Sequence, residues 1–170
     1  TRHGTLIAPN LIAPNHDHYF NFRLDFDIDG QANSFMRTGL VPGKAEDGAP
    51  RRSFWVTETK MAMSELGGRY KVNPDTPAMY HVMNMGAEGP LGHHPGYMIV
   101  PGNSVAYSPF DYSGDMPMKR NAYVEYTLWN TPYSASERYA GGRFAFQSDG
   151  SDTLAAWTQQ DRPIGNTDIV

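Results

Sequence analysis

The stretch Asn15-His16-Asp17-His18-Tyr19-Phe20-Asn21-Phe22-Arg23-Leu24-Asp25-Phe26-Asp27-Ile28-Asp29-Gly30 alternates between two kinds of residue almost without a break. One row holds two histidines followed by apolar side chains, and the other row is rich in aspartate. A period of two residues is typical of a β-strand with one buried face. The pattern therefore predicts a long strand whose apolar row faces the core and which ends at the turn dipeptide Asp29-Gly30.

Two groups of potential metal ligands lie along this predicted strand. His16 and His18 share one parity, so their imidazoles can converge on one metal ion. Asp25, Asp27 and Asp29 share the other parity and can offer carboxylates to a hard cation. Each group also has a simpler interpretation, namely two hydrogen-bonded histidines and a solvated acidic strand face. The spacing alone leaves both interpretations open.

Length and composition restrict the class of protein. The sequence has 170 residues, enough for one domain with a core, and a net charge of −4. Lysine and arginine are few and scattered, and no apolar run approaches a membrane span, so we expect neither nucleic acid nor membrane as a partner. Cysteine is absent, which excludes disulfides and thiolate ligands. No targeting pattern is present, which leaves periplasmic, extracellular and cytoplasmic locations open.

Short strand patterns separated by turn residues recur along the rest of the chain. They cover residues 6–8, 11–13, 53–59, 69–74, 79–84, 96–100 and 122–129. We expect a surface loop over 41–52 and a short helix over 154–160. Many short strands with regular turns predict an all-β architecture, a sandwich. Because a strand has barely begun at residues 168–170, we expect the chain to be a fragment of a larger domain.

Other side chains with metal-binding chemistry are less informative. Met61 and Met63 could form a soft copper-binding pair, but core packing or a plain loop is the commoner role. His81 lies in a predicted strand and could face either the core or the solvent. Adjacent residues on an extended chain point in opposite directions, so His93 and His94 would rarely share one ion, and we expect them to lie in a solvent-exposed loop.

The order of motifs along the chain resembles the primary amine oxidases that contain copper and topaquinone. The segment 15–30, followed by Asn33-Ser34, resembles the His-x-His segment of that family. Further matches follow in order at Leu128-Trp129-Asn130-Thr131-Pro132-Tyr133, Glu137-Arg138-Tyr139, Gly141-Gly142, Asp152-Thr153-Leu154 and Asp161-Arg162-Pro163-Ile164-Gly165-Asn166-Thr167-Asp168-Ile169-Val170. The resemblance covers nearly the whole chain, and this ordered set is far more specific than the histidine pair alone.

The resemblance implies a fold and an activity. The family converts a primary amine, O2 and water to an aldehyde, ammonia and hydrogen peroxide. Its catalytic domain is a large β-sandwich, a supersandwich, that forms a homodimer through long hairpin arms, and residues 1–170 would be its C-terminal part. Three histidines hold the copper. His16 and His18 match the first two, and the third lies shortly beyond the segment matched by 168–170.

The resemblance also implies a second, non-catalytic cation site for calcium or manganese. Its ligands would be the carboxylates of Asp25, Asp27 and Asp168 and the main-chain carbonyls of Phe26 and Ile169. Oxygen ligands of this kind suit calcium. Three carboxylates brought together without a cation repel one another, so binding should also tie the end of the chain to the first predicted strand. Asp29 would lie outside the site and cap the turn at Gly30.

Two parts of the family's catalytic machinery have no match in these residues. The quinone forms from a tyrosine in a Thr-x-x-Asn-Tyr-(Asp/Glu)-Tyr motif upstream of the histidine pair, and the catalytic base is an aspartate farther upstream. Amine oxidation needs the quinone to form a Schiff base and the base to remove a proton. We therefore expect the parent protein to be an amine oxidase and the isolated chain, which contributes no catalytic residue, to be inactive.

Two other classes of protein remain as alternatives. A non-catalytic metal-binding or structural β-sandwich derived from the same family would keep the histidine pair without the quinone. A calcium-dependent carbohydrate-binding sandwich would use the acidic row and the tryptophans. A quinone motif upstream and a histidine downstream would identify the oxidase, whereas calcium-dependent glycan binding would identify the third class. The identity of the amine does not follow from this segment.

Overall fold

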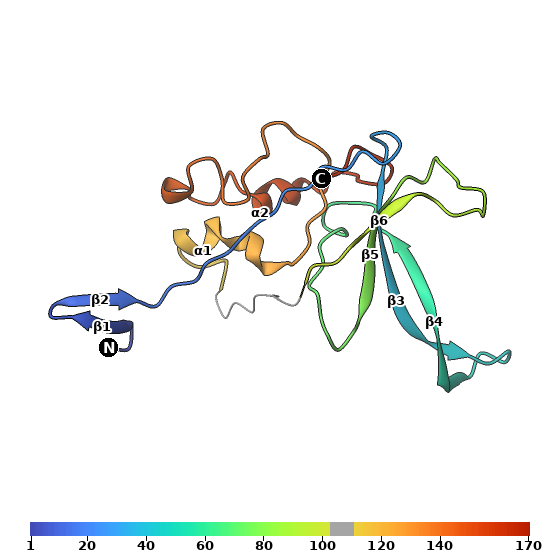
Figure 1. Cartoon of the computed structure of the whole chain (residues 1–170), viewed down its shortest axis with the longest axis horizontal. Helices are drawn as coiled ribbons and strands as arrows, with labels where there is room; N and C mark the ends of the chain where they lie inside the picture. Colours follow the sequence, from blue (N-terminus) through green and yellow to red (C-terminus); the bar gives the residue numbers. More distant parts are fainter. Residues whose placement is uncertain (103–110) are drawn as a thin grey trace.

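A four-stranded antiparallel sheet in the order β4-β3-β5-β6 is the main element of the computed structural model, which describes residues 1–102 and 111–170 and omits the side chains of residues 50–52 (Figure 1). Its strands are β3 (Ser34–Lys44), β4 (Pro50–Met61), β5 (Ala78–Met83) and β6 (Gly96–Ile99). A second, two-stranded sheet pairs β1 (Gly4–Ala8) with β2 (Leu11–Pro14) in a hairpin that lies well away from the main sheet.

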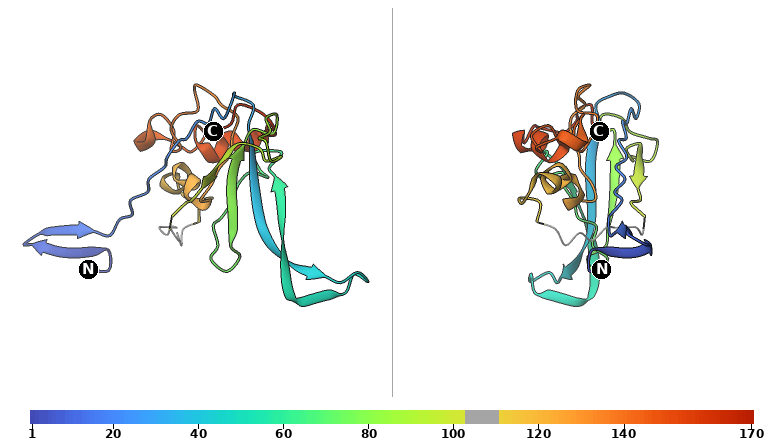
Figure 2. Two further views of the ribbon diagram at one scale, coloured as in Figure 1. Left: turned by 45° about the vertical axis from the view of Figure 1, so that its right-hand side comes forward. Right: turned by 90° about the vertical axis from the view of Figure 1, so that its left-hand side faces the viewer.

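Short helical turns gather on one side of the main sheet (Figure 2). They are α1 (Met116–Arg120), η1 (Ala122–Glu125), η2 (Ala145–Gln147), α2 (Leu154–Trp157) and η3 (Thr158–Gln160). The side chain of Thr153 accepts a hydrogen bond from the N–H of Ala156 and so caps α2. The expected helix over 154–160 is confirmed, and the prevalence of strands confirms the all-β expectation. Among the described residues, no helix has the length and apolar character needed to cross a membrane.

The core lies on the face of the sheet that carries Phe35. Its ring, 2% exposed, stacks on Tyr70 at 5.6 Å between centroids and meets Tyr80 at 6.1 Å. Ile164 and Ile169 are completely buried in the same cluster, although they come from the last residues of the chain. Burial of a large apolar side chain contributes about 1.5–3 kcal/mol. The C-terminal segment is therefore part of the core.

The predicted strand over 15–30 is wrong. These described residues run as irregular chain: Asn15 donates its main-chain N–H to the carbonyl of His3, and the one β-bridge joins Phe26 to Ile169. Phe20 and Phe22 are each 81% exposed, so the apolar row does not face a core here. Alternation favours an extended backbone, but a strand also needs a neighbour for its N–H and C=O groups. In the described part of the chain, no strand lies alongside residues 16–25.

Three other element predictions need correction. Residues 122–129 form η1 and then a single bridge between Leu128 and Tyr70, instead of a strand, and the 69–74 segment contributes only that bridge. The expected loop over 41–52 is mostly strand, because β3 and β4 continue to Lys44 and from Pro50. A register shift between Pro42 and Gly43 accommodates the proline in the ladder. The strands expected at 53–59, 79–84 and 96–100 are confirmed within β4, β5 and β6.

Candidate metal-binding sites

The imidazoles of His16 and His18 meet in the exposed segment that follows β2. Their Nε2 atoms lie 2.8 Å apart, and the ring planes meet at 64°. His16 Nδ1 lies 3.0 Å from the carbonyl oxygen of Pro14. A carbonyl can only accept, so Nδ1 carries the proton and Nε2 of His16 offers its lone pair. His18 Nε2–H then donates to His16 Nε2.

This pair fits an imidazole-binding metal after a small adjustment. Two nitrogens bound to one tetrahedral ion at 2.0–2.1 Å are separated by about 3.3 Å. The nitrogens of His16 and His18 therefore need to separate slightly, and His18 must present the lone pair of its Nε2. The bond from His16 to Pro14 orients the first ring for this role. Across residues 1–102 and 111–170, no three His, Asp or Glu side chains are grouped closely enough to share an ion, so these residues supply two nitrogen ligands.

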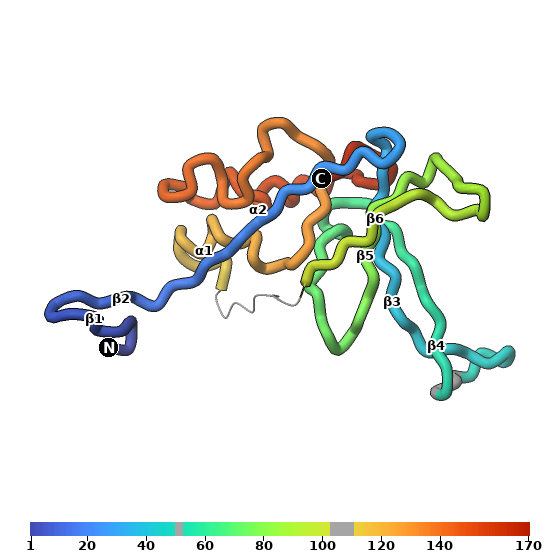
Figure 3. Tube along the Cα trace, viewed as in Figure 1, coloured from blue at the N-terminus to red at the C-terminus, as the bar shows by residue number. Residues whose placement is uncertain are grey.

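The antiparallel bridge between Phe26 and Ile169 brings the two ends of the predicted cation site together. Figure 3 shows the C-terminal end of the trace beside the segment that leads into the turn at residues 26–30. Pairing at these two residues places Asp168 near Asp25 and Asp27. The structure thus gathers all five residues of the predicted second site in one region, although the three carboxylates do not converge on a point.

The carboxyl group of Asp168 lies in surroundings that disfavour its charged form. Burial raises the pKa of its carboxyl, and the charges of Asp25 and Asp27 raise that pKa further, against the opposing effect of Arg23. Its Oδ1 is buried and has no hydrogen-bond partner among the described residues. The nearest ion pair is a loose contact of 4.0 Å between Arg23 Nη1 and Asp25 Oδ2. A bound hard cation would relieve both the repulsion and the missing partner.

Two buried asparagines hold the turn beside this region, and sequence reasoning gave neither of them a role. Asn33 Nδ2 donates to the carbonyls of Gly30 at 2.7 Å and Phe26 at 3.2 Å. Asn84 Nδ2 donates to the carbonyls of Ile28 at 2.8 Å and of the following residue at 3.0 Å. Asn33 stands within the quoted motif, so its position was a signal, whereas Asn84 follows β5 with no local sign of its long-range partners.

The remaining histidines of interest lie elsewhere. His93 is exposed, as expected for a loop, but His94 is half-buried and its Nδ1 lies 2.7 Å from the carbonyl of Ala87. His81 is half-buried on β5. None of the three approaches the pair His16 and His18 closely enough to complete a three-residue metal group in the described residues.

The sequence matches known proteins over its full length. Residues 1–170 match a family model described as the copper amine oxidase enzyme domain. The chain is 42% identical over 170 residues to a peroxisomal copper-containing amine oxidase, alpha 2, of Arabidopsis thaliana, covering 99% of this chain and 25% of that protein. It is 39% identical over 169 residues to a primary amine oxidase of Lens culinaris, with the same shares covered. The chain thus spans about a quarter of the length of these curated relatives.

Solved structures share the fold. The Aspergillus nidulans amine oxidase superposes with a TM-score of 0.72 at 19% identity, over 85% of this chain and 20% of that one. A copper-containing benzylamine oxidase from Hansenula polymorpha gives 0.63 at 20% identity, over 85% and 23% of the two chains. At these identities the likeness concerns the fold alone. It confirms the sequence-based expectation that this strand-rich chain is a fragment of a larger all-β domain.

Proposed function

The chain belongs to the copper amine oxidase family, and from this premise we propose that it forms part of the catalytic domain of a primary-amine oxidase. The whole protein would convert a primary amine, O2 and water to an aldehyde, ammonia and hydrogen peroxide. The family match over residues 1–170 is the observation that carries this proposal. The proximity of His16 and His18, whose Nε2 atoms lie 2.8 Å apart, supports it.

In that protein His16 and His18 would bind copper through their Nε2 atoms. The Pro14 carbonyl supports this role because it holds the proton of His16 on the opposite nitrogen. In that protein, bound copper and topaquinone would supply the redox chemistry with O2. The motif that forms the quinone does not occur in these 170 residues, so another part of the protein would provide it.

We further propose a second cation site, for calcium or manganese, at Asp25, Phe26, Asp27, Asp168 and Ile169. The bridge between Phe26 and Ile169 and the unpartnered Oδ1 of Asp168 support it. A cation would draw the three carboxylates inward and cancel their repulsion. Its role would be structural, because it would join the C-terminal segment to the turn at residues 26–30.

A homodimer is also part of the proposal. Within β3, only Ser34–Gly39 pairs with β5. The part of β3 beyond Gly39 pairs with β4 alone, so the two strands form a two-stranded ribbon there. Such a ribbon is marginally stable in water unless it packs against something. Trp55, 62% exposed, and the exposed Leu40 and Val56 line it. These side chains fit the apolar surface of a second copy of the protein.

The test uses the full-length protein, purified with copper and assayed for peroxide released from simple primary amines. We expect His16→Ala and His18→Ala each to reduce both copper content and peroxide release at least tenfold. His93→Ala, at an exposed loop histidine, is the matched control and should change neither. The 170-residue chain alone should release no peroxide.

The alternatives give different results in the same assay. A full-length protein that binds copper through His16 and His18 but oxidises no primary amine would be a non-catalytic metal-binding relative. Amine-dependent peroxide from the isolated chain would contradict the assignment of the quinone to another part of the protein. Full copper content in both histidine variants would contradict their role as ligands.

A further inference from the structure

The face of the main sheet opposite Phe35 carries a row of soft metal ligands. Main-chain pairing sets Met36 of β3 opposite both Met61 of β4 and His81 of β5, and it sets His81 opposite Met98 of β6. Directly paired residues of antiparallel strands point to the same side of the sheet. The four side chains therefore form one continuous row across all four strands, which we call the methionine–histidine row.

The surroundings of this row are uncharged and rich in sulfur. Met79 and Met83 stand two residues before and after His81 on β5, so they face the same side. The next pair on this face of β3 and β4 is Thr38 with Thr59, whose hydroxyl oxygens form a hydrogen bond of 2.8 Å. The basic side chains next to this row on β3 and β4 stand at the alternate strand positions, so they face the other side of the sheet. Among the described residues of these strands, no carboxylate faces the row.

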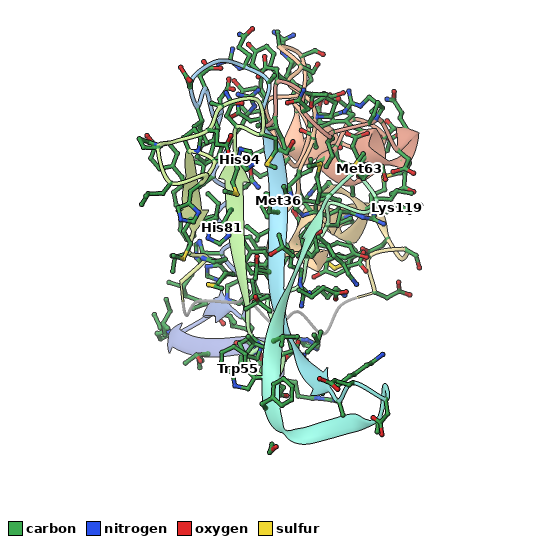
Figure 4. All side chains as sticks on the ribbon, turned by 90° about the vertical axis from the view of Figure 1, so that its right-hand side faces the viewer. Met36, Trp55, Met63, His81, His94 and Lys119 are labelled. Carbon is green, nitrogen blue, oxygen red and sulfur yellow. The ribbon has the colours of Figure 1, made fainter. Side chains whose placement is uncertain are left out.

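The spacing of the strands suits shared ligation. Paired Cα atoms of antiparallel strands are about 4.5–5.5 Å apart, a distance that an unbranched methionine side chain with three rotatable bonds can span. Met36 and Met98 therefore flank the imidazole of His81 within reach from both sides. Figure 4 shows Met36 and His81 on neighbouring strands of the sheet. Neither ring nitrogen of His81 has a hydrogen-bond partner in the described part of the chain, so both are available.

Burial differs along the row in a way that suits a bound ion. Met36 is 7% exposed, His81 is half-buried and Met98 is 56% exposed. An ion held between them would enter past Met98 and rest against the closed side formed by Met36. Since all the facing ligands are neutral, a single positive charge is less costly to bring there than a double charge.

We propose that the methionine–histidine row binds one soft monovalent ion of the Cu(I) class, held by the thioethers of Met36 and Met98 and by the imidazole of His81. Thioether sulfur selects Cu(I) over hard cations, and imidazole is compatible with it. The row shares no residue with His16 and His18 or with the carboxylate region, and its binding does not depend on amine oxidation. It is thus an additional metal site on the sheet itself.

The test titrates Ag(I), a redox-inert probe with the same ligand preference, into the full-length protein labelled with 13C at the methionine methyl groups. The protein carries His16→Ala and His18→Ala, which remove the histidine pair from competition. We expect one equivalent of Ag(I) to shift the methyl signals of Met36 and Met98 and to leave Met116 unchanged. Met116 is exposed on α1, away from the sheet, and serves as the internal control.

Variants then identify the ligands. Met98→Leu preserves volume at an exposed position, and we expect it to weaken Ag(I) binding at least tenfold, as should His81→Gln. Met116→Leu is the matched control and should bind as before. The proposal is overturned if Ag(I) leaves the Met36 and Met98 methyl signals unshifted. It is equally overturned if the folded Met98→Leu and His81→Gln proteins bind Ag(I) as tightly as the control.

Discussion

Arg162 holds the completely buried carboxylate of Glu65 with its side chain and its main chain. Nε and Nη2 donate to the two carboxylate oxygens at 3.0 and 2.7 Å, and the main-chain N–H adds a third bond at 2.8 Å. The same guanidinium also donates to Glu137 at 3.0 and 2.8 Å. These bonds, those to Glu65 first, hold the pKa of Arg162 above its usual range. One arginine therefore ties the residues after β4 to the C-terminal segment.

Arg162→Met should destabilise the protein strongly. It removes the partner of a carboxylate that has no access to water, and loss of one member of a buried ion pair costs about 3–5 kcal/mol. Urea unfolding would measure the change. The control is Lys60→Met, which removes an exposed pair of 3.0 Å to Glu58 and should cost below about 1 kcal/mol. Equal losses in the two variants would show that Glu65 is not held by Arg162 in solution.

Phe35→Ala should remove the centre of the core. The ring contacts Tyr70 and Tyr80, and deletion of a buried phenylalanine costs about 3–5 kcal/mol. Phe146→Ala deletes the same atoms at a position that is 95% exposed, so its unfolding free energy should stay within about 0.5 kcal/mol of wild type. Thermal unfolding followed by near-ultraviolet circular dichroism compares the pair. A small effect of Phe35→Ala would mean that the aromatic cluster is not packed.

The effect of Asp168→Asn on stability should change sign when calcium is added. The pKa of Asp168 is raised in the folded protein, so its favourable contribution exists below the unfolded pKa and is lost as pH rises through the folded pKa. Without calcium the variant should therefore match wild type at pH 3 and exceed it at pH 7. With calcium at 100 times its Kd, wild type should gain about 2.7 kcal/mol and the variant much less.

Melting temperatures in EDTA and in calcium, at both pH values, check this prediction. Asp75→Asn replaces an exposed aspartate far along the chain from the proposed site and is the control. If calcium stabilises wild type and Asp168→Asn equally, the cation does not bind at Asp168.

Trp55→Lys should weaken the proposed homodimer. The indole stands on the two-stranded end of the β3–β4 hairpin, and a buried tryptophan at the centre of an interface commonly dominates binding. We expect the dimer Kd of the full-length protein to rise at least tenfold, which sedimentation equilibrium can measure. Phe146→Lys, another exposed aromatic residue replaced in the same way, should leave the Kd unchanged. A dimer that tolerates Trp55→Lys would have its interface elsewhere.

The sequence predicted the local conformation of segments better than it predicted which segments pair with one another. The β-branched and aromatic content of 53–59 identified β4, because that segment pairs with β3 directly before it in the chain. The alternation of 15–30 predicted a strand that did not form, since extended residues without a neighbour have no ladder to join. The 41–52 segment looked like a loop because of its prolines and glycines, yet β3 and β4 extend into it, with a register shift between Pro42 and Gly43.

The candidate sites show the same contrast between local and long-range relationships. His16 and His18 are two residues apart, so their meeting follows from local geometry. The proximity of Asp168 to Asp25 depends on a bridge between distant segments, and the motif resemblance rather than any periodicity indicated it. Glu65 and Arg162 carried no sign of each other at all, because a long-range ion pair leaves no periodic trace in a sequence.

The burial of Ile164 and Ile169 against Phe35 has a consequence for synthesis. A ribosome makes this chain from its N-terminal side, so Phe35 leaves the exit tunnel long before the isoleucines that cover it. At roughly 5–20 residues per second, the delay is on the order of ten seconds. During that time the aromatic face of the sheet is open to other nascent chains. The core of the sheet therefore stays uncovered until the segment with Ile164 and Ile169 emerges, and a pause in translation after β6 would prolong that exposure.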